Sequence, residues 1–217
     1  MKNLNIKPFI YLFVIISVVI FVITTTIRGY KLTEYINLLK VVPIVVTVDG
    51  FIYLLFIRWI WRWKFLQGWL VPFPDLNGTW DGIIQTNWRD KNGIIPGPIP
   101  TLLTIKQSFG RISCVMRTAE MVSRNYSEGF CLNMDEQKRQ ICFSYTSRPS
   151  VLLRDRSTPH DGTALLDIVG TKELKLHGEY WTQRGTSGTL TFNYYSREVL
   201  QELPNDFPQH PIHNSND

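Results

Sequence analysis

The chain has 217 residues, 44% of them hydrophobic, and a formal net charge of +5. Residues 1–68 hold eight Lys and Arg against two acids, giving +6, whereas residues 69–217 hold fifteen against sixteen, giving −1. The basic residues in excess therefore belong to residues 1–68. The nearly neutral net charge of residues 69–217 argues against a surface for long nucleic acids, although it is compatible with a local basic patch.

The first predicted element is an apolar helix. Residues 9–27 contain no charged side chain, and at about 1.5 Å per residue this run matches a hydrocarbon core of roughly 30 Å. A cleaved signal peptide is the alternative, but the run is too long, no small-residue cleavage motif follows, and a second apolar run comes soon after. We therefore expect a membrane-spanning helix.

A second span is predicted at residues 41–57, which include Pro43 and Asp49. The stretch RWIWRWK follows at residues 58–64, and this mixture of Arg, Lys and Trp is typical of a helix end at the lipid headgroups. An acid in a span costs about 2.5–3.5 kcal/mol. We therefore predict that Asp49 faces a partner helix, a neighbouring subunit or water and is functional in the membrane. The alternative is a protonated or snorkelling acid that only weakens insertion.

Basic residues beside the two spans indicate their orientation. Five basic residues lie before the first span or after the second, namely Lys2, Lys7, Arg58, Arg62 and Lys64. Three lie in the loop between the spans, namely Arg28, Lys31 and Lys40. The bias favours both ends of the chain, and hence the soluble part, in the cytoplasm.

Cysteine and histidine give no sign of a disulfide framework or a metal site. Cys114, Cys131 and Cys142 are odd in number and lack C-x-x-C spacing, which favours small apolar strand residues in a reducing compartment. His210 and His213 form an H-x-x-H pair, but they lie in a segment rich in Pro, Asn and Asp that predicts a disordered tail. We expect no metal and no cofactor.

Beyond residue 78 the sequence predicts strands, because polar and apolar residues alternate with period two between short turn segments. Short connections favour antiparallel neighbours. The eight predicted strands span residues 79–88, 101–109, 111–118, 121–133, 139–147, 163–170, 173–182 and 189–196.

Eight sequential antiparallel strands can close on themselves and hold side chains or one small ligand. The predicted fold is therefore a membrane-anchored, all-β protein, with an eight-stranded up-and-down, lipocalin-like barrel; a two-sheet sandwich is the alternative. The predicted domains are a two-helix anchor at 1–68, a linker at 69–77, a barrel at 78–200 and a disordered tail at 201–217.

The residues predicted to point inward become more polar toward the C-terminal ends of the odd-numbered strands. On the seventh strand, for example, Leu174 and Leu176 give way to Tyr180, Thr182 and Arg184. In an up-and-down barrel these ends meet at one rim, so we predict one apolar end and one polar mouth, facing away from the bilayer. Buried polar groups need partners, which a ligand can supply.

The residue types at the predicted mouth fit an anionic ligand that carries rings. Arginines suit phosphate, aromatic rings suit stacking on a base, and hydroxyls complete the lining, although each side chain alone is also compatible with a solvated turn or a packed core. The predicted ligand-binding residues are Thr86, Trp88, Arg117, Thr118, Ser123, Arg124, Tyr145, Ser147, Tyr180, Thr182 and Arg184, with Trp181 as a further stacking candidate.

Motifs of enzymes are missing from the sequence. There is no nucleophile-elbow spacing, no phosphate loop of the GKS type, and no His, Cys and acid cluster typical of a hydrolase or metalloenzyme. We therefore predict a protein that is not an enzyme and has no catalytic residues.

Two apolar spans followed by the segments LNGTWDGIIQTNW and LKLHGEYWTQRGTSGTLTF resemble the two-transmembrane β-barrel effectors of bacterial CBASS anti-phage defence. The resemblance extends over residues 9–196. Its most specific parts are Gly78-Thr79-Trp80 and the segment from Gly178 to Thr182, followed by Arg184.

The resemblance implies a multi-pass protein of the bacterial inner membrane with its barrel in the cytoplasm. The barrel would bind a cyclic di- or trinucleotide made by a partner nucleotidyltransferase, and the chain would then oligomerise, disrupt the membrane and kill the cell before phage mature. Two alternatives stay open, namely a membrane-tethered carrier of a hydrophobic ligand and a structural interaction module with a filled barrel.

Overall fold

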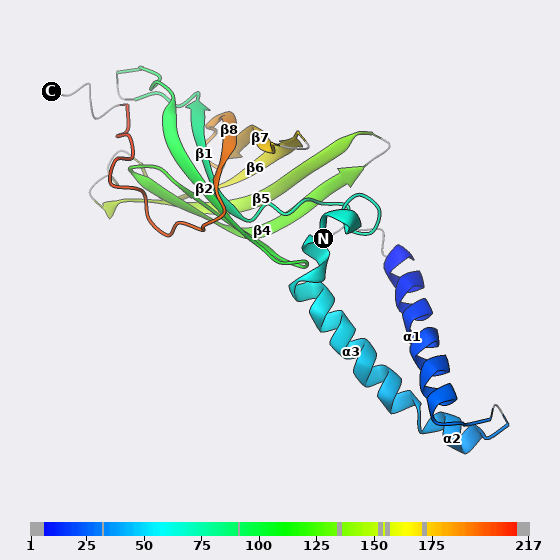
Figure 1. Ribbon diagram of the computed structural model, residues 1–217. Helices are drawn as coiled ribbons and strands as arrows, with labels where there is room; N and C mark the ends of the chain where they lie inside the picture. The colour runs from blue at the N-terminus through cyan, green and yellow to red at the C-terminus, as the bar shows by residue number, and fades with distance from the viewer. Residues whose placement is uncertain are drawn as a thin grey trace. The chain divides into compact units, whose positions relative to one another are not determined.

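The computed structural model describes residues 7–31, 33–90, 92–133, 136–151, 154, 157–170 and 173–211. The described residues divide into two compact units, 7–74 and 75–211. The first contains helices and the second contains strands (Figure 1).

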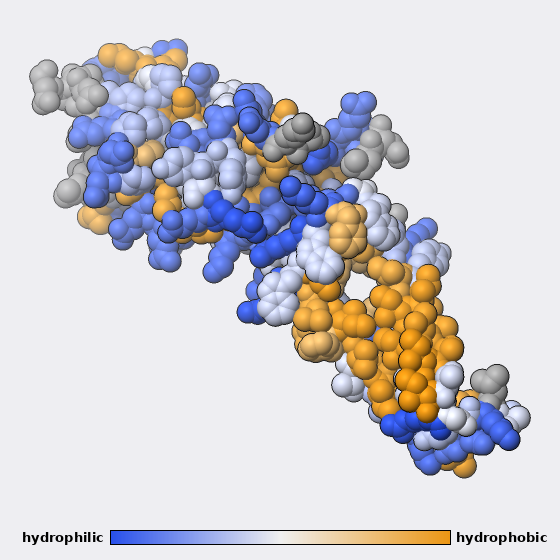
Figure 2. Space-filling view, in the orientation of Figure 1, coloured by the Kyte–Doolittle hydropathy of each residue, from blue (hydrophilic) through white to orange (hydrophobic). Residues whose placement is uncertain are grey.

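The first unit is an antiparallel helical hairpin. Its long helices are α1 (Lys7–Ile27) and α3 (Val42–Arg58), which are connected through the short α2 (Tyr35–Leu39). Lys7–Ile27 and Tyr35–Arg58 are each long and apolar enough to cross a membrane, and Figure 2 shows an apolar surface over α1 and α3. The predicted helices are confirmed. Two 3-10 turns follow, η1 (Ile60–Arg62) and η2 (Lys64–Leu66).

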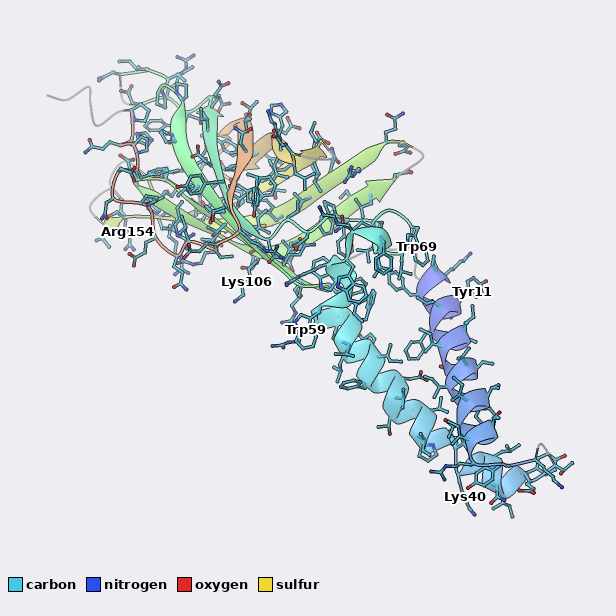
Figure 3. The ribbon with its side chains drawn as sticks, in the orientation of Figure 1. Tyr11, Lys40, Trp59, Trp69, Lys106 and Arg154 are labelled. Carbon is cyan, nitrogen blue, oxygen red and sulfur yellow. The ribbon has the colours of Figure 1, made fainter. Side chains whose placement is uncertain are left out.

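Aromatic and basic side chains lie at the ends of this hairpin. Tyr11 and Trp59 are at the end where α1 begins and α3 ends, and Lys40 is at the other end, near α2 (Figure 3). The Arg58 guanidinium lies 5.6 Å from the centre of the Trp59 ring. Such residues favour the headgroup region of a bilayer over its hydrocarbon core.

The second unit is a closed barrel of eight strands. Each strand pairs antiparallel with the next, and β1 pairs with β8, so that neither edge is left open. The predicted barrel is therefore confirmed over the alternative sandwich. The strands are β1 (Gly78–Thr86), β2 (Ile99–Gln107), β3 (Ile112–Arg117), β4 (Met121–Asn133), β5 (Lys138–Pro149), β6 (His160–Val169), β7 (Lys175–Thr182) and β8 (Ser187–Ser196).

The barrel interior is apolar at the end where β1 begins. Trp80, Leu103, Ile141, Leu176 and Phe192 are fully buried there and in the middle of the barrel. The Trp80 indole N–H donates to the carbonyl oxygen of Leu76 at 3.0 Å, so its polar atom is satisfied. This packed interior forms the floor beneath the opposite, polar end.

Strand β6 begins at His160, three residues before the predicted start at residue 163. The sequence HDG has the composition of a turn, yet Gly162 pairs with Tyr145 within the sheet. A Cβ at Gly162 would lie 2.6 Å from the Tyr145 hydroxyl oxygen. Glycine is therefore required here because an aromatic side chain lies over the strand, not because the chain turns.

Candidate functional site

The polar end of the barrel contains a cavity of about 120 Å³. It lies where β1, β3, β5 and β7 end and the even-numbered strands begin, as the alternation predicts. Nine of the eleven predicted residues line it, namely Thr86, Trp88, Thr118, Ser123, Tyr145, Ser147, Tyr180, Thr182 and Arg184.

Arg117 and Arg124 were predicted at the mouth, but neither lines this cavity. Arg117 Nη1 donates to Thr104 Oγ1 on the neighbouring strand at 2.9 Å, and Arg124 is exposed. Burial, with a smaller effect of the Arg124 charge, lowers the pKa of Arg117. Both lie away from the cavity because each follows an inward residue, and consecutive strand residues point to opposite faces.

Trp181 also lies outside the cavity, with 46% of its surface exposed. It sits between Tyr180 and Thr182, which both line the cavity. The same alternation explains its position. Trp88 is the tryptophan that the cavity offers for stacking among the described residues.

Two tyrosines enter the cavity because glycines lie beneath their rings. Gly162 leaves room for Tyr145, and a Cβ at Gly188 would lie 2.8 Å from the Tyr180 ring. The Tyr180 hydroxyl donates to Thr86 Oγ1 at 2.8 Å. The Tyr145 side chain is buried and lines the cavity. Burial raises the pKa of both tyrosines, so both keep a proton that can be donated.

Several other cavity hydroxyls bond to one another. Ser123 Oγ and Ser147 Oγ are 2.8 Å apart, and Thr182 Oγ1 and Thr186 Oγ1 are 2.6 Å apart. The expectation that these hydroxyls need a ligand as a partner is therefore too simple. Each pair still has unused lone pairs, and the serine pair has one hydroxyl hydrogen outside its shared bond. Thr182 Oγ1 also donates to the Thr186 carbonyl oxygen at 3.3 Å.

Arg184 lies in the turn between β7 and β8 and reaches the connection between β5 and β6. Its Nη1 donates to Ser157 Oγ at 3.3 Å and to the Thr158 carbonyl oxygen at 3.4 Å. Its Nη2 lies 3.4 Å from His160 Nε2. Partial burial lowers the pKa of Arg184, but arginine stays cationic at neutral pH. These long contacts leave it well placed to exchange partners for an anion.

His160 supports Arg184 as a neutral acceptor. Its Nδ1 lies 2.9 Å from the Thr158 carbonyl oxygen, so Nδ1 carries the hydrogen and Nε2 is free to accept from Arg184. Burial lowers the pKa of His160, and the Arg184 charge acts in the same direction. The imidazole therefore does not add a second positive charge beside Arg184 at neutral pH.

The predicted set missed Glu120, His160, Thr186 and His210, which also line the cavity. Three of these could have been found, because Glu120 and Thr186 continue the alternating series of their strands into the turns and His160 begins the series that Gly162 and Ala164 continue on β6. His210 could not, because it comes from the C-terminal segment, which has no periodicity. Residues 201–211 were expected to be disordered, and the structure places His210 of this segment at the cavity; residues 212–217, including His213, lie outside the described residues.

Asp49 faces the neighbouring helix of its own chain. The Ser17 hydroxyl on α1 donates to Asp49 Oδ2 at 2.7 Å. Asp49 is 7% exposed, and its other oxygen, Oδ1, is buried without a hydrogen-bond partner within the described part of the chain. Of the environments considered for this acid, the structure shows a partner helix, which satisfies half of the carboxyl group.

The cysteines lie in the barrel as free thiols. Burial raises the pKa of Cys114 well above its usual value, which makes the thiolate scarce. Across the described residues, no group of three or more His, Cys, Asp or Glu side chains could hold a metal ion.

Residues 71–194, more than half of the chain, match the Cap15 cyclic dinucleotide receptor domain. A relative from Staphylococcus schleiferi, CD-NTase-associated protein 15, is 24% identical over 155 residues, which cover 71% of this chain and 79% of the relative. The nine predicted residues at the cavity all lie within the matched range.

Proposed function

Because the chain belongs to the Cap15 cyclic dinucleotide receptor family, a family of CBASS effectors, we propose that its barrel cavity binds a cyclic oligonucleotide. The ligand is a cyclic di- or trinucleotide released by a partner nucleotidyltransferase during phage infection. The barrel then acts as a sensor and catalyses no reaction.

The observation that carries this proposal is the convergence of three kinds of group on one cavity. Arg184 provides a cation for phosphate, Tyr145 and Trp88 provide rings for the bases, and paired hydroxyls provide adaptable hydrogen bonds. A charge-assisted hydrogen bond contributes about 1.5–3 kcal/mol, and stacking contributes about 1–3 kcal/mol per base. A hydrocarbon ligand would leave Arg184 and the Tyr145 hydroxyl without these interactions.

We propose further that ligand binding leads the helical hairpins of several copies to associate and disrupt the bacterial inner membrane. In this scheme the hairpin spans the membrane twice and the barrel lies in the cytoplasm. A ligand can shift the chain toward an associated state only if it binds that state more tightly. The two apolar helices and the half-satisfied Asp49 support this part of the proposal.

A thermal-shift panel on the full chain in detergent tests the ligand class. We expect cyclic di- and trinucleotides to raise the melting temperature, because a ligand that binds the folded state stabilises it. Linear dinucleotides of the same bases are the matched control. Stabilisation by fatty acids with no response to any cyclic nucleotide would instead support the alternative of a hydrophobic-ligand carrier, and no response to either class would favour the structural module.

A further inference from the structure

The C-terminal segment, residues 197–211, continues from β8 along the outer wall of the barrel. Thr79 Oγ1 donates to the Glu198 carbonyl oxygen at 2.6 Å and accepts from the Leu200 N–H at 3.1 Å. Thr79 and its cross-strand partner Thr104 alternate with the inward Trp80 and Leu103, so they point outward, yet both are buried. The beginning of the segment is therefore held against the barrel wall at Glu198 and Leu200.

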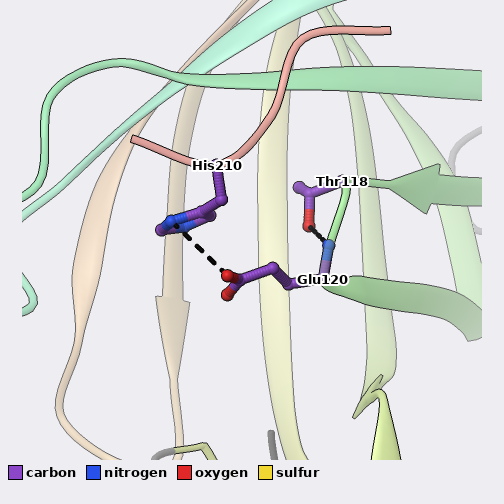
Figure 4. A network of polar contacts seen from close by, with 3 residues as sticks. All are labelled: Thr118, Glu120 and His210. Atoms are coloured by element: carbon purple, nitrogen blue, oxygen red, sulfur yellow. Dashed lines mark hydrogen bonds and ion pairs between the residues drawn. The ribbon is translucent and has the colours of Figure 1, made fainter. Parts of the chain in front are cut away.

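The far end of this segment reaches the mouth of the cavity. The His210 ring lines the cavity, and its Nδ1 lies 3.8 Å from Glu120 Oε1 (Figure 4). The two side chains are only 10% and 15% exposed. Glu120 is itself held in the turn between β3 and β4, where its N–H donates to Thr118 Oγ1 and its carbonyl oxygen accepts from the Ser150 N–H.

Glu120 and Arg184 lie on opposite sides of the mouth. Glu120 is in the β3–β4 turn and Arg184 is in the β7–β8 turn, and in a closed ring of eight strands these two turns are four strands apart in either direction. The mouth thus has an acceptor carboxylate facing a donor guanidinium. A ligand that fits both must present an anion on one side and N–H donors on the other.

Nucleobases present such donors beside phosphate. A carboxylate can accept from the adjacent N1–H and N2–H of guanine, or from the single exocyclic amino group of adenine, and these charge-assisted bonds are among the stronger hydrogen bonds. An imidazole ring is likewise a flat nitrogen heterocycle with an N–H donor at its edge. His210 therefore places beside Glu120 a ring of the kind that a base would place there, with its Nδ1 3.8 Å from the carboxylate oxygen.

We propose that Glu120 is the residue that recognises a base edge in this cavity, and that His210 occupies the position of that base in the unliganded chain. This inference rests on the proposed function. It also accounts for the cavity volume of about 120 Å³, which is below the roughly 300–1,000 Å³ usual for ligand pockets. Displacement of His210 opens the mouth to a larger ligand.

Two substitutions test whether Glu120 contacts a base of the ligand or only holds His210 in place. His210→Ala removes the internal occupant, so we expect the full chain in detergent to bind cyclic dinucleotides about 3- to 10-fold more tightly. Glu120→Gln also releases His210, but it removes the carboxylate, so we expect binding about 10-fold weaker. The loss should be larger for guanine than for adenine, because guanine offers two adjacent donors.

The measurement is calorimetric titration with cyclic di-GMP, cyclic GMP-AMP and cyclic di-AMP. His177→Ala and Glu179→Gln, both at exposed positions on β7, are matched controls that should leave affinity unchanged. Opposite changes in Glu120→Gln and His210→Ala support the inference. Tighter binding by both variants would mean that Glu120 only holds His210 in place. Weaker binding by His210→Ala would mean that His210 itself contacts the ligand. Either result overturns the inference, as does unchanged affinity in both variants.

The same titration distinguishes failure of this inference from failure of the proposed function. If the wild-type chain binds none of the cyclic nucleotides, including the trinucleotides of the thermal-shift panel, the proposed function fails and this inference fails with it. If the wild type binds a cyclic dinucleotide and the variants do not diverge, the cavity is a receptor site in which Glu120 does not read the base.

Discussion

The barrel mouth and the helical hairpin both bury polar groups, but they satisfy them differently. At the mouth, hydroxyls form pairs such as Ser123 with Ser147, and Arg184 has several long contacts. In the hairpin, Asp49 receives one hydrogen bond from Ser17 and keeps one buried oxygen without a partner within the described residues. The hydroxyls at the mouth thus have hydrogen-bond partners without a ligand and can change them. The Asp49 carboxyl group lacks a hydrogen-bond donor, among the residues that the structure describes, for one of its two oxygens.

This difference indicates where each region can respond to a partner. A hydroxyl pair can rotate its hydrogens to meet a new group at little cost. A buried, unsatisfied acceptor costs about 1–3 kcal/mol, and a donor from another helix would offset that cost. This difference supports the proposals that the mouth binds the ligand and that the hairpin associates with a second copy.

The largest effect is expected from Asp49→Ala. Ligand affinity should stay within about 2-fold, because the cavity residues all belong to the other unit. Ligand-triggered dye leakage from proteoliposomes should slow by about 10-fold or more, because the variant loses the proposed charge-assisted bond between Asp49 and a helix of a second copy. Insertion should not suffer, since an acid in a span costs about 2.5–3.5 kcal/mol and alanine avoids that cost.

Ser17→Ala sharpens this test, because it removes the bond within the chain but leaves the carboxyl group in place. We expect this variant to retain leakage. Full leakage with Asp49→Ala would show that Asp49 is structural and would remove the proposed contrast between the two regions.

The next largest effect is expected from Arg184→Ala. Loss of a charge-assisted bond to phosphate should weaken binding of the active cyclic nucleotide by about 10- to 100-fold. Arg124→Ala is the matched control, because Arg124 is exposed and does not line the cavity; its affinity should change by less than about 2-fold. Calorimetric titration of both variants checks the result, and equal losses would mean that general positive charge, not the cavity, attracts the ligand.

Much of this arrangement could be predicted from alternation alone, because a barrel wall has only two faces. The series that ends in Thr182 and Arg184 therefore indicated both the cavity and its polar end. Arg117 and Arg124 do not line the cavity, because each lies on the face of its strand opposite to the inward residue before it. His210 could not be predicted, because its position depends on contacts of a segment without periodicity, such as the hydrogen bonds of Thr79 to Glu198 and Leu200.

The smallest effect is expected from the hydroxyl pair on β4 and β5. Ser123 and Ser147 are 5% and 1% exposed, so Ser123→Ala leaves the other hydroxyl buried without this partner and should lower the free energy of unfolding by about 1–2 kcal/mol. Ser147→Ala should behave alike. The double variant should cost less than the sum of the two, because no orphaned hydroxyl remains. Thermal unfolding of the four proteins measures this coupling, and strict additivity would mean that the two hydroxyls are satisfied separately, contrary to the paired mouth described above.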